Sequence, residues 1–221
     1  MKKILTFFLF ICIFSISIQA DTLAKAKNLW RNKQYKAALE IYKQEASNDN
    51  PKALYFLARL NYQKRNFDLA KKYLEKASSL GFLKARYNLG IFYQNKSTRY
   101  FDLKKSFNIF YTLATKDGYA SAQNRIGLFL QHGIYVQKNY KLAVKWYEKS
   151  AKQGNLNAEC NLAFMYASGK GVFPNFGRAH NFAKRGYKQG QIVCSKVWND
   201  YHLAKFTKDE GFKFGFYKPI D

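Results

Sequence analysis

The sequence predicts an all-α solenoid, a stack of about five helix-pair repeats. The first observation behind this prediction is a short motif, Gly-x-x-x-Ala, that recurs through much of the 221-residue chain. Self-similarity at a fixed period is typical of architectures in which each repeat packs only on its neighbours. The motif occurs as Gly81 with Ala85, Gly118 with Ala122 and Gly154 with Ala158, and in degenerate form as Gly190 with Cys194, at intervals of 37, 36 and 36 residues.

The second observation is a set of apolar columns at helical spacing. A large apolar residue lies four positions after each Ala or its equivalent, and spacings of three and four residues are the helical period. The expected core residues are Leu57, Leu89, Ile126, Leu162 and Trp198. The next column is small, which lets neighbouring helices approach closely, and it contains Ala58, Gly90, Gly127 and Ala163.

A second helix is predicted in each unit, beginning after a polar residue that precedes an aromatic one. These pairs are Gln34-Tyr35, Asn66-Phe67, Asn139-Tyr140 and Asn175-Phe176. Asparagine is a favourable N-cap because its side-chain oxygen accepts from a first-turn N–H. The buried face of the second helices is expected at Ile41, Tyr73, Phe110, Trp146 and Phe182, with Phe107 in the small position of the third unit. Each second helix should end at the next glycine, where a left-handed residue closes the last turn.

Two stretches carry a family resemblance. The run 162–172, Leu-Ala-Phe-Met-Tyr-Ala-Ser-Gly-Lys-Gly-Val, is followed seven residues later by Ala179 and resembles a Sel-1-like repeat, as does the segment 126–154. The resemblance is specific over about 83–190. Units 22–50 and 51–81 have shorter inter-helix turns, such as 63–66, and are more similar to tetratricopeptide repeats (TPRs). Both families imply a right-handed α/α superhelix whose concave surface binds other proteins.

The chain is expected to comprise three parts: a signal peptide (1–20), a repeat domain (21–203) and an aromatic tail (204–221). The predicted units lie near 22–50, 51–81, 82–118, 119–154 and 155–190, followed by a terminal helix at 191–203. The tail alternates Phe212, Phe214, Phe216 and Tyr217 with glycine and lysine. It is expected either to cap the last repeat or to act as a docking peptide.

The first twenty residues have the layout of a secretory signal peptide, with Lys2-Lys3 before an apolar run that ends near Ala20. The apolar segment 4–18 is shorter than the roughly 20 residues of a membrane span. Cleavage after Ala20 is therefore expected, with retention as an anchor as the alternative. The composition favours a bacterial periplasmic or secreted protein.

A large excess of positive charge marks the chain. Removal of residues 1–20 takes away two lysines and no acidic residue, which leaves 36 basic and 14 acidic residues and a formal charge of +22. Many basic residues fall on the predicted second helices, which face outward in this kind of repeat. An alternative function is therefore binding of anionic envelope polymer or lipid through the convex face. Nucleic acid is not an expected partner, because no recognition motif is present.

Cys160 and Cys194 remain after processing and lie early in the first helices of successive units. They are expected either to form a disulfide, as an oxidising compartment permits, or to be two buried free thiols. A cysteine-rich branch of the Sel-1-like family has been associated with penicillin binding. Its regular cysteine pairing is missing here, and so is the Ser-x-x-Lys spacing of a serine β-lactamase, so a β-lactam-directed activity ranks third and the chain is not expected to be an enzyme.

The predicted function is an exported scaffold that binds a protein partner, of unknown identity, through the concave face. Candidate partner-binding positions are the non-recurring polar residues of the first helices, Arg86, Asn88, Gln123, Arg125, Glu159 and Asn161. Stacking does not require these positions, so they are available to specify a partner. No cofactor or metal site is expected, because His132, His180 and His202 lack metal-ligand spacing.

Overall fold

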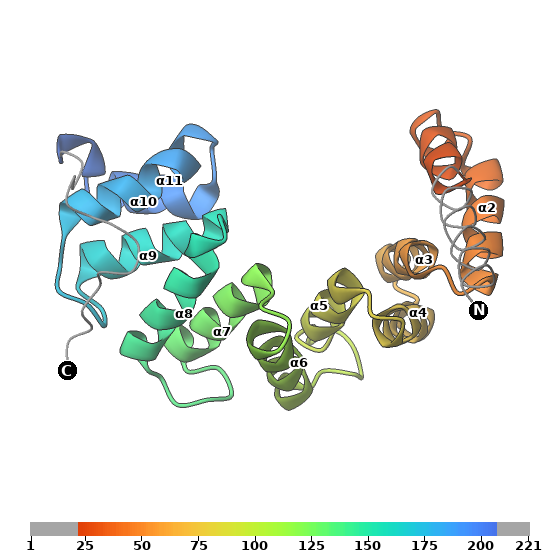
Figure 1. Ribbon diagram of the computed structural model, residues 1–221, viewed down its shortest axis with the longest axis horizontal. Coiled ribbons are helices and arrows are strands. Elements are labelled where there is room, and N and C mark those ends of the chain that lie inside the picture. Colours follow the sequence, from red (N-terminus) through yellow and green to blue (C-terminus); the bar gives the residue numbers. More distant parts are fainter. Residues whose placement is uncertain (1–21, 207–221) are drawn as a thin grey trace, which may run out of the picture. The chain divides into compact units, whose positions relative to one another are not determined.

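The computed structural model describes residues 22–206, and its regular secondary structure is helical, with no strand among these residues (Figure 1). The predicted fold class, an all-α solenoid of helix pairs, is confirmed. The described residues form two compact units, 22–89 and 90–206. Each unit is described by itself.

The first unit contains the TPR-like helices. A helical segment at 22–31 is followed by α2 (Tyr35–Ser47), α3 (Pro51–Gln63), α4 (Phe67–Ser79) and the greater part of α5 (Leu83–Phe92). Helix α3 packs against both α2 and α4. The turns that join these helices are short, so consecutive helices form antiparallel hairpins.

The second unit begins with the end of α5. It contains α6 (Leu103–Thr115), α7 (Ala120–His132), α8 (Tyr140–Lys152), α9 (Leu156–Ser168), α10 (Phe176–Lys188), α11 (Ile192–Asp200) and the 3₁₀ helix η1 (Leu203–Lys205). Each helix from α6 to α11 packs against the next, and α9 also contacts α11. First helices of successive repeats thus contact each other directly at this end of the stack.

Side-chain caps start most of the described helices. The predicted caps Asn66, Asn139 and Asn175 are confirmed, since their Oδ1 atoms accept from Leu69 N, Leu142 N and Arg178 N at 3.4, 2.9 and 2.9 Å. Asn155 caps α9 in the same way. Gln34 differs, because its side chain makes no capping bond to α2.

Glycine closes the junction after each second helix from α4 onward. Gly154 has φ +78°, and Gly81, Gly118 and Gly190 also have positive φ. No atom outside the neighbouring residues lies within 4 Å of a β-carbon built at Gly154. The loss of stability expected from Gly154→Val would therefore arise from the left-handed backbone conformation and not from a steric clash.

The alanine of each Gly-x-x-x-Ala motif lies in the first turn of a first helix and is packed on every side. Ala85, Ala122 and Ala158 are all 0% exposed. The apolar column four residues later is buried as well, at Leu89, Ile126 and Leu162. These repeat residues therefore belong to the core between helices and present no surface to a partner, so recurrence in this sequence marks packing positions and not a binding site.

The column of small residues on the first helices includes glycine where an aromatic side chain of the second helix packs against the backbone. A β-carbon at Gly90 would lie 2.8 Å from the Phe110 ring, and one at Gly127 would lie 2.6 Å from Cδ1 of Tyr147. Both rings are fully buried. Glycine is thus required where the facing second helix carries an aromatic residue at this level.

The buried face predicted for the second helices was partly wrong, because some of its positions are displaced by one residue. The small position of the third unit is filled by Ser106, whose buried Oγ donates to Gly90 O at 2.8 Å, and not by Phe107, which is half-buried. The column at Ile41, Tyr73 and Trp146 is only partly buried as well. The predicted Phe110 and Phe182 are buried, but in the other three helices the buried column lies one residue later, at Tyr42, Leu74 and Tyr147.

The described chain ends by folding back onto the last repeat. Leu203 is fully buried, its carbonyl oxygen lies 2.9 Å from Nδ1 of His180, and the Phe206 ring stacks on Phe176 at 4.6 Å. The predicted tail thus begins as a cover for α10. Its remainder, 207–221, lies outside the described residues, as does the predicted signal peptide.

Candidate binding surfaces

Two of the polar candidates on the first helices are engaged between helices. The Glu159 carboxylate pairs with the Arg185 guanidinium of α10 at 2.7 Å, and the same guanidinium donates to Gly154 O at 3.0 Å. Burial raises the pKa of Glu159, while Arg185 acts in the opposite direction. Gln123, one repeat earlier, is buried and accepts from Nε2 of Gln153 at 2.8 Å. Positions 123 and 159 therefore join a first helix to a second helix.

The asparagines of the candidate set link successive repeats. Asn161 Nδ2 donates to Asn124 Oδ1 at 2.9 Å, and Asn88 Nδ2 donates to the Tyr55 hydroxyl at 3.1 Å. Each contact joins a first helix to the first helix of the preceding repeat. These asparagines therefore form hydrogen bonds between first helices of successive repeats.

Arg86 and Arg125 are the two cationic members of the candidate set. Both side chains are half-buried. Arg86 occupies the position that Glu159 has in its own repeat, and Arg125 occupies the position of Asn161. Of the six candidates, these two arginines carry the positive charge that could attract a partner.

The two cysteines form a covalent link between successive repeats. A disulfide joins Cys160 of α9 to Cys194 of α11, with their Cα atoms 4.7 Å apart. The Oε1 atom of Gln191 lies 3.2 Å from Sγ of Cys160 and accepts from the backbone N–H of Cys194 at 2.7 Å. Of the two alternatives drawn from the sequence, the bonded form is the one present in the structure.

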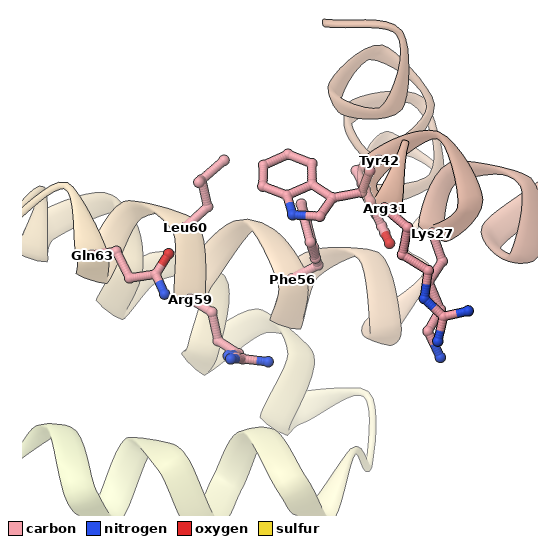
Figure 2. Close-up of a pocket in the computed structure, with 8 residues that line it drawn as sticks. Lys27, Arg31, Tyr42, Phe56, Arg59, Leu60 and Gln63 are labelled. Carbon is pink, nitrogen blue, oxygen red and sulfur yellow. The ribbon is translucent and has the colours of Figure 1, made fainter. Parts of the chain in front are cut away.

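A pocket that the sequence analysis did not identify lies in the first unit. It has a volume of about 370 Å³ and is formed by segment 22–31, α2 and α3 (Figure 2). Its polar lining includes Lys27, Arg31 and Arg59, and Figure 2 shows Arg31 and Arg59 extending from different helices. The sequence signal that could have indicated it is the pair of cations at 27 and 31, one helical turn apart and flanking Trp30.

The apolar wall of this pocket is aromatic. Tyr42 and Phe56 stack with ring centroids 3.6 Å apart and planes 10° apart, and Trp30 meets Phe56 edge-on at 4.9 Å. Tyr42 is buried, which raises the pKa of its hydroxyl. Leu60 and Gln63 of α3 complete the lining of the pocket. The rings come from three helices, so the wall exists only when these helices are packed.

The second helices of the second unit carry a row of exposed cations. Glu148 lies among them, half-buried, and burial raises the pKa of its carboxyl to about 7 despite nearby Lys152, Arg178 and Lys145. The surface therefore loses part of its positive charge as Glu148 ionises near neutral pH. These exposed cations include Lys141, Lys145, Lys149 and Lys152 on α8 and Lys184 and Lys188 on α10.

The histidines are dispersed. His180 is buried against Leu203 O, whereas His132 and His202 are not buried. Within the described part of the chain, no three His, Cys, Asp or Glu side chains are placed to hold a metal ion. Across residues 22–206, too, every helix is too short or too polar to cross a lipid bilayer.

The stacked helix pairs and their inter-repeat links define a helical-repeat protein. More particularly, a family model described as Sel1 repeat matches residues 120–155 and 156–191, and one described as tetratricopeptide repeat matches 29–89. The chain therefore contains Sel1 repeats in its second unit and TPR-like repeats in its first, which confirms the resemblance. Sel1 repeat proteins as a class mediate protein–protein interaction.

Solved structures show the same architecture. The Sel1 repeat protein from Oxalobacter formigenes is 26% identical with a TM-score of 0.65, over 80% of this chain and 74% of that one. The protein c5321, a protective antigen of uropathogenic Escherichia coli strains displaying an SLR fold, is 27% identical with a TM-score of 0.65, over 76% of this chain and 37% of that one.

A curated relative is known from fission yeast. Chitin synthase regulatory factor 3 of Schizosaccharomyces pombe is 29% identical over an alignment of 176 positions that covers 69% of this chain. The chain spans only 18% of the length of that protein. The similarity thus concerns a small part of a much larger molecule.

Proposed function

We propose that this chain is an exported scaffold that binds one or more protein partners along the first helices of its repeats. The observation that carries the proposal is the match of both units to repeats of the Sel1 and TPR kind. Repeats of this kind present an extended surface whose exposed positions vary without loss of the stack. Arg86 and Arg125 are the two cationic candidate positions on these helices.

Two features support an exported location. The first is the charged and apolar start of the sequence, Lys2-Lys3 followed by 4–18, which has the pattern of a signal peptide. The second is the disulfide between Cys160 and Cys194, since structural disulfides persist in oxidising compartments and are rare in the cytosol.

The experiment is an affinity pull-down from envelope extract with the processed chain, at low and at high salt. The test variant is Arg86→Ser with Arg125→Ser, and Lys141→Ser with Lys145→Ser on α8 is a control of equal charge. Glu159 and Gln123 are left intact, because they join helices. Capture of a protein that persists at high salt and is lost only with the test variant supports the scaffold function. Equal capture by both variants contradicts binding along the first helices.

A second candidate function is binding of an anionic envelope polymer or lipid through the second helices. The specific observation in its favour is the row of exposed lysines on α8 and α10. Long-range attraction to polyanions falls steeply with salt. Retention on anionic vesicles that is lost at high salt and reduced by Lys141→Ser with Lys145→Ser supports this function, whereas equal retention of that variant contradicts it.

A further inference from the structure

The pocket of the first unit combines charge and apolar surface in one small volume. At about 370 Å³ it falls within the range of roughly 300–1,000 Å³ typical of ligand pockets. Such a volume admits one or two side chains of a partner and not a folded surface. The occupant is therefore expected to be an extended segment or a small molecule.

The cations of the pocket have no acidic partner within the described part of the chain. Among residues 22–206, no carboxylate forms an ion pair with Lys27, Arg31 or Arg59. The guanidinium of Arg59 instead lies 6.0 Å from the ring centroid of Tyr55. The three cations are therefore available to an anionic ligand.

The glutamates of α2, the helix that supplies Tyr42, are committed elsewhere. Glu40 pairs with Lys43 at 3.0 Å. Glu45 is buried and accepts from Nδ2 of Asn50 at 2.8 Å. Neither carboxylate neutralises the pocket, so its positive charge is uncompensated from this side.

The aromatic wall favours an aliphatic or aromatic side chain over a flat base. Tyr42 and Phe56 stack face to face, so each ring has one face covered by the other. The plane of the Trp30 ring makes an angle of 83° with that of Phe56. A nucleobase gains most when it stacks on an open ring face. A branched side chain can instead pack against ring edges without such a face, and burial of apolar area is non-directional.

We propose that this pocket binds an acidic peptide segment. Its carboxylates are held by Lys27, Arg31 and Arg59, and an adjacent apolar side chain packs against the rings of Trp30, Tyr42 and Phe56. Arginine suits this role because its planar guanidinium pairs with a carboxylate through two parallel hydrogen bonds. The inference rests on the proposed function, since it names the chemistry of one partner segment of the scaffold.

The test uses fluorescence anisotropy with the processed chain and a labelled peptide of alternating aspartate and leucine. A peptide in which asparagine replaces aspartate reports the charge requirement, and one in which serine replaces leucine reports the apolar requirement. The pocket variant is Arg31→Gln with Arg59→Gln. Its control is Lys52→Gln with Arg65→Gln, which removes two exposed cations of the same unit outside the pocket.

The expected result is that the pocket variant weakens binding of the aspartate–leucine peptide by about tenfold or more, as loss of charge-assisted hydrogen bonds implies, while the control variant changes it little. Both substituted peptides should bind more weakly than the parent. Trp30→Ala, which leaves the charge of the pocket unchanged, should weaken binding of the parent peptide as well. Thermal unfolding of each variant is measured alongside, and an unchanged midpoint shows that the first unit remains folded.

Three results would overturn the inference: equal binding of either substituted peptide, equal weakening by the control variant, or displacement of the peptide by inorganic phosphate or anionic vesicles as readily as by unlabelled peptide. If the peptide does not bind but the pull-down still captures a salt-resistant protein, the pocket assignment fails and the scaffold function stands. If neither binds, both fail.

Discussion

Gly186 of α10 lies against Cys194 in the disulfide that joins the neighbouring first helices. A β-carbon at position 186 would stand 2.8 Å from Cβ of Cys194 and 3.0 Å from Sγ of Cys160. The second helix can approach the disulfide only because residue 186 has no side chain. The sequence alone did not suggest this role for a glycine in the middle of a helix.

Gly186→Ala is expected to destabilise the second unit by about 1–3 kcal/mol, the usual cost of overpacking a filled core. Alanine is the better helix former by about 1 kcal/mol, so a purely local effect would have the opposite sign. Urea denaturation measures the difference. The same change in a variant with both Cys160→Ala and Cys194→Ala should cost less, because the sulfur atoms are gone, and an identical cost in both backgrounds would argue against the contact.

Reduction of the disulfide should lower the free energy of unfolding of the second unit. The bond closes a loop between residues 34 apart, and constraint of the unfolded chain by such a loop contributes about 2–4 kcal/mol. The measurement is denaturation with and without a thiol reductant. The variant with Cys160→Ala and Cys194→Ala should not respond to the reductant, and a similar response would show that the effect lies elsewhere.

Leu162→Ala should lower the free energy of unfolding by about 2–5 kcal/mol, because the side chain of Leu162 in α9 is fully buried and its truncation leaves a cavity. The matched control is Leu142→Ala on α8, whose side chain is 40% exposed. Denaturation midpoints of the two variants compare directly. Equal shifts would contradict the assignment of Leu162 to the core.

The stability of the second unit is expected to fall as pH rises from about 4.5 to about 7. Burial raises the pKa of Glu148 from 4.5 to about 7 in the folded chain. Between these values the folded state therefore holds a proton that the unfolded state has released, and stability decreases with pH in that window. The partial exposure of Glu148 makes the effect modest.

Glu148→Gln should flatten this part of the pH profile, since glutamine does not titrate. Unfolding midpoints measured at several pH values across this window test the change. Glu75→Gln is a control, because Glu75 is exposed and lies in the first unit. A profile that remains as steep in Glu148→Gln as in the parent would assign the dependence to another group.

The repeat period could be recognised from the sequence because the same motif recurs every 36 or 37 residues. The apolar columns and the asparagine caps could be recognised as well, because each depends on residues three to four positions apart within one helix. Leu162 is buried and Asn139 caps α8 for such local reasons. The third unit shows the limit of this reasoning. The aromatic Phe107 suggested a core position, but the cap Asp102 and the buried Ser106 set the register one residue earlier.

By itself, the sequence determined that this protein is a stack of helix pairs, since helical periodicity and repetition are properties of the chain. Only the tertiary structure decided which polar residues serve the stack, as Glu159 does by pairing with Arg185, and which cations remain available, as Arg31 and Arg59 do. The physical reason is that ion pairing, ring stacking and disulfide formation depend on distances between helices. Those distances join residues such as Trp30 and Phe56, or Cys160 and Cys194, that lie 26 and 34 positions apart in the sequence.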